Sequence, residues 1–248
     1  MGTAKDLALL DAGLPAPAVG GFTTRAGGRS PAPYTGLDLA LHVGDDPALV
    51  AENRSLLARA VGLEPGSLVF AEQVHGRGVA VVEDPVTGAL PGVDALVTAT
   101  PGLGLVVLAA DCLPVLLADP DAGVVAAAHA GRQGLAGGVL QAVLATMARL
   151  GARPATTVAA LGPAACGECY ELPAPMADAV DALVPGSRAR TRQGTASVDL
   201  AAGAEALLRR AGLTRVTRVG GCTLEQQELY SYRRDGRTGR HGGLVLLA

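Results

Sequence analysis

Aromatic residues are scarce in this chain of 248 residues, which has no Trp, two Phe and four Tyr. Its core must therefore be built from smaller aliphatic side chains. With 49% hydrophobic and 17% charged residues, the chain has enough apolar material to bury one. We assign no function to this bias, because the codon usage of a GC-rich genome accounts for it.

A strong excess of charge of one sign is lacking as well. The net charge is -3, and the charged residues are spread along the chain without long blocks of one sign. The exception is a short arginine-rich segment at 233–240. Because nucleic-acid-binding proteins usually present a basic face, we predict no nucleic-acid partner.

Long uncharged apolar runs are absent too. The most hydrophobic stretch, residues 102–131, is interrupted by three aspartates, whereas a membrane-spanning helix needs about 18 or more apolar residues in a row. Near the N-terminus, Asp6 and Asp11 flank an apolar segment that is too short for a signal peptide. We therefore predict a cytoplasmic protein without a membrane segment.

Four cysteines are too few for a disulfide framework in a chain of this length. In a reducing compartment, packing, metal binding or nucleophilic chemistry must explain each of them. Cys166 and Cys169 have the spacing of redox and zinc motifs, but the sequence contains no second pair of this kind. We interpret that pair as part of a loop, and Cys222 as a buried residue after a strand.

Apolar runs and turn residues predict an α+β fold in one domain over residues 1–248. Four short apolar segments follow one another between residues 93 and 131 with no room for helices. They predict a sheet that is at least partly antiparallel, because parallel strands need long crossovers. Asp46-Pro47 predicts the start of a helix that ends near Ala60. The other predicted elements are strands at 67–70, 79–82, 157–161, 215–221 and 243–247, and helices at 135–150, 176–183 and 200–211.

Cys112 and His129 flank a predicted hairpin with a strong turn sequence at 119–123. If the turn is centred near residue 120 or 121, the two residues lie opposite or nearly opposite each other, with Cβ atoms about 4.5–5.5 Å apart. Such a pair suits two ligands of one metal ion or a Cys–His nucleophilic dyad. A buried cysteine beside a hydrogen-bonded histidine is the third interpretation.

His75 lies in a short polar segment between two predicted strands. Alone it would be interpreted as structural. Together with Cys112 and His129 it completes a His2Cys set, which is typical of catalytic zinc sites with an open fourth position. A ligating histidine usually donates its other ring N–H to an acceptor, and Asp94 and Asp111 are the candidates.

Short motifs along nearly the whole chain carry a family resemblance. They are FTTRAGG (22–28), LHVGDDP (41–47), ENR (52–54), QVHG (73–76), DALVT (94–98), ADCLPVLLAD (110–119), AAHAG (127–131), GP…CYEL (162–172) and YSYRRDGRTGR (230–240). In this order they resemble the YfiH-like family, which has long been labelled laccase-domain or polyphenol oxidase.

The resemblance implies a sandwich of mixed β-sheets flanked by helices, shared with the Cys–His toxin deamidases. It implies one zinc ion held by His75, Cys112 and His129. It also implies phosphorolysis of purine nucleosides (adenosine, inosine, guanosine and methylthioadenosine) and deamination of adenosine.

Each reaction requires further groups. Deamination needs a carboxylate that carries a proton to the leaving ammonia, while the metal activates water. We predict Asp111 for this role, with orientation of Cys112 or His129 as its alternative.

Phosphorolysis needs arginine or backbone N–H donors around a phosphate. Arg25, in a glycine-rich turn, and the group Arg233, Arg234 and Arg240 are the candidates; an ordinary turn and surface solvation are their alternatives. The predicted substrate-binding residues are Arg25, Gln73, Asp94 and Arg233.

Three functions stay open on the sequence alone. The leading hypothesis is a zinc-dependent purine nucleoside phosphorylase with adenosine deaminase activity, acting on small molecules as a monomer or weak homodimer. The second is a Cys–His hydrolase or amidase acting on cell-wall precursors, with Cys112 as nucleophile. The third is a zinc-stabilised binding protein without turnover.

Copper is the alternative metal, because it binds N/S sites more tightly than zinc. A multicopper oxidase needs about ten histidines for its copper centres, and this chain has four. Polyphenol oxidation could therefore come only from a single copper ion.

Overall fold

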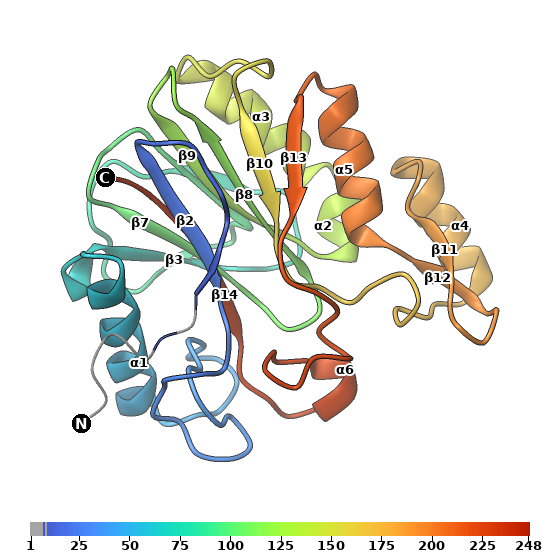
Figure 1. Ribbon diagram of the computed structural model, residues 1–248, viewed down its shortest axis with the longest axis horizontal. Coiled ribbons are helices and arrows are strands. Elements are labelled where there is room, and N and C mark those ends of the chain that lie inside the picture. Colours follow the sequence, from blue (N-terminus) through green and yellow to red (C-terminus); the bar gives the residue numbers. More distant parts are fainter. Residues whose placement is uncertain (1–6, 8) are drawn as a thin grey trace.

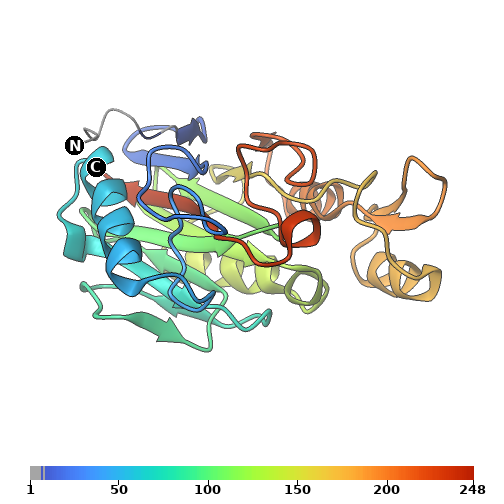
Figure 2. The ribbon, with the colours of Figure 1, turned by 90° about the horizontal axis from the view of Figure 1, so that it is seen from below.

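Two six-stranded sheets pack face to face in the computed structural model, which describes residue 7 and residues 9–248 (Figure 1). The N-terminal segment on which the signal-peptide prediction rests lies partly outside these residues. Helices cover the outer face of each sheet (Figure 2). The predicted α+β class, with two mixed sheets flanked by helices, is confirmed.

The first sheet has the strand order β1-β2-β14-β7-β3-β5. Its strands are β1 (Leu9–Asp11), β2 (Ala18–Thr23), β14 (His241–Leu247), β7 (Gly104–Ala109), β3 (Leu68–Glu72) and β5 (Ala89–Pro91). β7, β3 and β5 are parallel to one another, and the other neighbouring pairs are antiparallel. Because β3 and β7 run in the same direction, the loops that follow them emerge at one edge of this sheet.

The second sheet has the order β13-β10-β8-β9-β6-β4. Its strands are β13 (Arg215–Arg218), β10 (Val158–Leu161), β8 (Leu113–Asp119), β9 (Val124–Ala130), β6 (Ala95–Thr98) and β4 (Val79–Val81). The four central strands are antiparallel, while the outermost strand on each side pairs in parallel.

Alternating residues of the central strands enter two different apolar layers. In β8, Val115 and Leu117 pack towards the helices α3 (Val139–Arg149) and α5 (Leu200–Arg210), whereas Leu116 faces the first sheet. Helix α1 (Pro47–Ala60) covers the far side of the first sheet. Because both faces of the central strands are covered, β7, β8 and β9 are buried along their whole length and show no polar alternation.

The predicted helix at 135–150 is in fact two helices, α2 (Arg132–Ala136) and α3. Gly138 separates them with a φ of 92°, a left-handed conformation that glycine adopts without penalty. The remaining elements are a 3-10 turn at Pro65–Ser67, α4 (Ala174–Leu183), the hairpin β11 (Arg188–Arg190) and β12 (Ala196–Val198), and α6 (Tyr232–Asp235). α4 and the hairpin project from one end of the molecule (Figures 1 and 2).

The predicted register of the β8–β9 hairpin is wrong by two residues. Pro114, not Cys112, lies opposite His129, because the loop consists of residues 120–123 and is centred after Asp121. Cys112 immediately precedes β8. A shift of two residues keeps a side chain on the same face of the sheet, so Cys112 still lies on the side of His129.

The described part of the chain contains no helix with the length and apolar character needed to cross a membrane.

The carboxylate of Asp119 closes the β8–β9 loop and is 1% exposed. Its Oδ1 accepts the N–H groups of Asp121 and Ala122, and its Oδ2 accepts the Arg153 N–H and the Thr156 hydroxyl. Burial alone would raise the pKa of Asp119, but the hydrogen bonds from Thr156 and Arg153 hold it below its usual value.

We predict that Asp119→Asn lowers the free energy of unfolding at pH 7 by about 1–3 kcal/mol, because an amide can accept on one side only. The contribution is complete above the unfolded pKa of about 3.9 and disappears as the pH falls through the lower folded pKa. Urea unfolding from pH 7 to pH 3 measures it, with the exposed Asp121→Asn as the control. A loss equal to that of the control would contradict the prediction.

Candidate metal centre

Three loops or strand ends bring His75, Cys112 and His129 together. His75 follows β3, Cys112 lies between β7 and β8, and His129 is the penultimate residue of β9. One ligand atom from each lies within 4.8 Å of the others, and Cys112 Sγ is 3.8 Å from His75 Nε2. The group predicted from the sequence is therefore assembled at one place.

Asp94, just before β6, holds two members of this group. Its Oδ1 lies 2.8 Å from His129 Nδ1 and accepts the backbone N–H of His75. Its Oδ2 accepts the N–H groups of Val74 and Gly76. With Nδ1 directed at Asp94, the other ring nitrogen of His129, Nε2, is left for a metal ion. Asp94 is thus the acceptor expected for a ligating histidine, and Asp111 makes no such contact.

Two residues of the site have unusual backbone conformations. His75 has a φ of 59° and Asp111 a φ of 93°; they are the non-glycine residues with positive φ in the described part of the chain. Such conformations cost energy and persist where the surroundings enforce them. The hydrogen bonds from the loop around His75 to Asp94 enforce the conformation of His75. Asp111 is held by the Thr223 hydroxyl at 2.6 Å and the Arg233 N–H at 2.7 Å.

The electrostatics of the group favour a thiolate. Burial would raise the pKa of Cys112, but hydrogen bonds to His129 and His75 lower it to about 6. Burial would lower the pKa of His129, whereas its bonds to Asp94 and Cys112 raise it to about 9. The thiolate is the form of cysteine that binds metals.

The geometry fits a tetrahedral zinc ion. With Zn–S near 2.3 Å and Zn–N of about 2.0–2.1 Å, sulfur and nitrogen ligands lie about 3.6 Å apart, close to the 3.8 Å between Cys112 and His75. Three protein ligands leave one position open, the arrangement of catalytic rather than structural zinc sites.

A cavity of about 630 Å³ opens beside this group and is lined by all three of its members. Its volume is typical of small-molecule sites. The rings of Tyr170 and Tyr232 and the side chain of Leu200 give it apolar walls. Arg233 and Arg240 bring positive charge, and the guanidinium of Arg233 lies 4.2 Å from the centre of the Tyr170 ring.

Only two of the four predicted substrate-binding residues line the cavity. Arg233 and Gln73 line the cavity, but both polar ends of the Gln73 amide are bound to the backbone of Leu108. Asp94 is completely buried beneath the histidines, so it does not reach a substrate. Arg25 is not among the described residues that line the cavity; its guanidinium contacts the carbonyls of Thr35 and Gln227.

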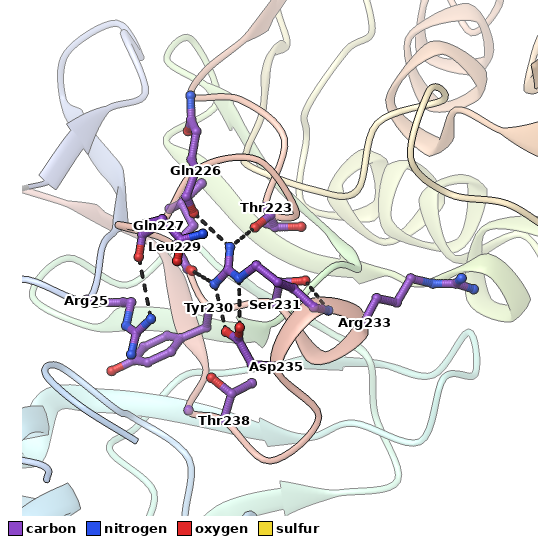
Figure 3. A network of polar contacts seen from close by, with 12 residues as sticks. Arg25, Thr223, Gln226, Gln227, Leu229, Tyr230, Ser231, Arg233, Asp235 and Thr238 are labelled. Atoms are coloured by element: carbon purple, nitrogen blue, oxygen red, sulfur yellow. Dashed lines mark hydrogen bonds and ion pairs between the residues drawn. The ribbon is translucent and has the colours of Figure 1, made fainter. Parts of the chain in front are cut away.

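Arg234 is part of the fold rather than of the cavity wall. Its guanidinium donates to the carbonyls of Thr223, Gln226 and Leu229 and pairs with Asp235 (Figure 3). These bonds fix the loop that precedes α6.

Sequence reasoning missed several residues of the site. It named neither Tyr170 nor Tyr232, because an aromatic residue in a loop gives no periodic signal. His42 also lines the cavity. His241 begins β14 and is fully buried.

Comparison with known proteins relates most of the chain to one family. A family model described as "Multi-copper polyphenol oxidoreductase laccase" matches residues 19–248. The "Purine nucleoside phosphorylase ORF3" of Streptomyces griseus is 52% identical over 228 residues, 91% of this chain and 93% of the relative. A purine nucleoside phosphorylase of Corynebacterium glutamicum is 48% identical with the same coverage.

Solved structures agree with the fold. YlmD from Geobacillus stearothermophilus aligns with a TM-score of 0.89 and 34% identity, covering 96% of both chains. The Neisseria meningitidis protein NMB0706 aligns with a TM-score of 0.86 and 37% identity, covering 98% of this chain and 99% of its own. A Bacillus licheniformis protein described as hypothetical protein YfiH also aligns, with a TM-score of 0.86 and 30% identity.

Gly131 lies against the metal-ligand group and provides a test of it. A Cβ atom there would be 2.9 Å from His75 Cδ2 and 3.1 Å from Cys112 Sγ, although the φ of -68° suits any residue. Overpacking costs about 1–3 kcal/mol, so we predict that Gly131→Ala weakens Zn²⁺ binding by about tenfold or more. Competition titration with a chromophoric chelator measures this.

The matched control is Gly66→Ala, whose Cβ would meet nothing within 4 Å. We expect it to bind Zn²⁺ like the wild type. Equal affinities for both variants would mean that the three residues do not form a metal site.

Proposed function

Because the chain belongs to the family described as multi-copper polyphenol oxidoreductase laccase, we propose that it acts at this cavity as a purine nucleoside phosphorylase. One observation carries the proposal: a His2Cys group, two tyrosine rings and two arginines converge on one cavity. The names of its curated relatives support it. The copper oxidation in the family's description is less well supported, since four histidines are too few for multicopper chemistry.

The apolar part of the cavity suits a nucleoside. Tyr170 and Tyr232 present ring faces on which a purine can stack, an interaction worth about 1–3 kcal/mol per base in nucleic-acid binding. The Arg233 guanidinium packs against the Tyr170 ring and fixes its position. Leu108 and Leu200 extend the apolar wall.

Phosphate needs cationic or N–H donors next to the ribose. We assign this role to Arg233 and Arg240, in place of Arg25, because their side chains line the cavity. The Arg240 guanidinium is held by the carbonyls of Thr238 and Gly239, which fixes its position. In the reaction a phosphate oxygen bonds to ribose C1′ while the bond from C1′ to the purine nitrogen breaks. The electron pair leaves with the base, which takes up a proton.

Zinc is the proposed resident metal, held by His75, Cys112 and His129. When bound, it supplies Lewis acidity to an oxygen of substrate or water. That chemistry also supports adenosine deamination at the same site, and we propose this as a second activity. Both carboxylate oxygens of Asp111 already accept hydrogen bonds. We therefore assign Asp111 to fixing the cavity wall and the position of Cys112, ahead of a role in proton transfer.

The test follows adenosine and inosine by chromatography with metal-analysed protein, with and without phosphate. We predict phosphate-dependent release of adenine and hypoxanthine with ribose-1-phosphate, and formation of inosine from adenosine where deamination occurs. Cys112→Ser should lower phosphorolysis by at least about 10²-fold, because it removes a metal ligand. Gly66→Ala, outside the cavity wall, is the control for substitution.

Other outcomes separate the alternatives. Turnover that needs no phosphate and survives chelation, with covalent labelling of Cys112, would favour the Cys–His hydrolase. Full zinc occupancy without turnover of any nucleoside would contradict the proposal and favour a binding protein. Oxidation of phenols dependent on bound copper would favour the polyphenol oxidase.

A further inference from the structure

A second group of metal-ligating side chains lies outside the cavity wall. Cys166, Cys169, Cys222 and Glu225 each offer one ligand atom, and these atoms all lie within 4.8 Å of one another. The sequence places Cys222 more than fifty residues after the other two cysteines, and we interpreted it as merely buried. Cys222 is indeed buried, and because β10 and β13 pair in parallel, the loops that follow them bring it to Cys166.

The four residues come from two turns of the same kind. The N–H of Cys169 donates to the carbonyl of Cys166, and the N–H of Glu225 donates to the carbonyl of Cys222. Each turn therefore presents its first and fourth residue on one side. The turns also contact each other, because the N–H of Cys166 donates to the Sγ of Cys222 at 3.4 Å. Two facing turns with ligands spaced three residues apart are a common way to build a structural zinc site.

The distances suit zinc. Tetrahedral coordination with Zn–S near 2.3 Å separates two sulfurs by about 3.8 Å, and a sulfur from a carboxylate oxygen by about 3.6 Å. Cys169 Sγ lies 3.4 Å from Glu225 Oε1, and the upper limit of 4.8 Å for the whole group leaves room for the sulfurs. All four cysteines of the chain are free, so no disulfide competes for these thiols.

Coordination to a dication deprotonates thiols, so this group would bind zinc as three thiolates and one carboxylate. Arg192 pairs with Glu225 and Glu168, which positions the carboxylate at the rim.

We propose that Cys166, Cys169, Cys222 and Glu225 form a second, structural zinc site with a closed Cys3Glu ligand set. Unlike the His2Cys centre, it has four protein ligands and no open position. This proposal does not depend on the proposed function.

Residues next to this group belong to the cavity wall or contact it. Tyr170 follows Cys169, and its N–H donates to the Cys166 carbonyl. Thr223 follows Cys222, and its hydroxyl donates to Asp111. Its carbonyl also accepts from the Arg234 guanidinium (Figure 3). A zinc ion here would fix the Tyr170 ring and the Asp111 carboxylate on one wall.

Metal counting tests the proposal in the full-length protein. After anaerobic reconstitution with Zn²⁺ and removal of excess metal, we expect two zinc ions per chain in the wild type. Cys112→Ala should retain one, and Cys112→Ala combined with Cys169→Ser should retain none. Co²⁺ substitution of Cys112→Ala should give the intense thiolate-to-cobalt absorption of a sulfur-rich tetrahedral site.

A second measurement leaves all four ligands of the second group unchanged. It therefore does not require the double variant to fold. In Cys112→Ala, the remaining three thiols should react rapidly with a thiol reagent when metal-free and slowly when zinc is present. The proposal is overturned if Cys112→Ala holds no more zinc than the double variant, or if zinc leaves these thiols equally reactive. Oxidation to a disulfide that zinc does not prevent would overturn it in the same way.

Discussion

The buried carboxylate of Asp94 is the interaction on which the cavity depends. It accepts three consecutive backbone N–H groups from the loop after β3 and meets His129 Nδ1. Its own carbonyl accepts the His129 N–H at 2.7 Å. Burial would raise the pKa of Asp94, but the bonds from His129 and Gly76 hold it low, so it stays charged. Asp94 thus connects the loop after β3 of the first sheet to β9 of the second sheet, and it orients His75 and His129.

The opposite wall of the cavity is organised around Asp111 in a similar way. Its strained backbone is tied by the Ala165 N–H to the loop after β10, and its carboxylate by Thr223 and the Arg233 N–H to the C-terminal loops. These are the loops that carry the second cysteine group. The cavity therefore lies between two carboxylates that hold its walls. Asp94 holds the two histidines, and Asp111 is bonded to the loops that carry the cysteine turns. The apolar layers only fix the positions of the strands.

How much of this could be predicted differs from element to element. The apolar runs of β8 and β9 and the cap at Asp46 are local signals, and those elements were located to within a residue. Strands β1, β2, β5, β11 and β12 were missed, since four of them have only three residues and β2 contains two adjacent glycines, so their form depends on neighbouring strands. Cys112 was placed near His129 despite a wrong register, because the error was an even number of residues. The meeting of Cys222 with Cys166 could not be foreseen, as it depends on which strands pair across the sheet.

The most direct test of this account is the affinity for Zn²⁺ of Asp94→Asn, compared with that of the wild type by competition titration. The amide has nearly the shape of the carboxylate, but it must turn an N–H₂ group towards either the His75–His129 side or the Val74–Gly76 side. Loss of the acceptor of a metal-binding histidine typically costs 10–100-fold in affinity. We expect a weakening in that range at the His2Cys centre, in protein whose fold is unchanged by circular dichroism. Unchanged affinity would contradict the claim that Asp94 sets the geometry of the metal centre.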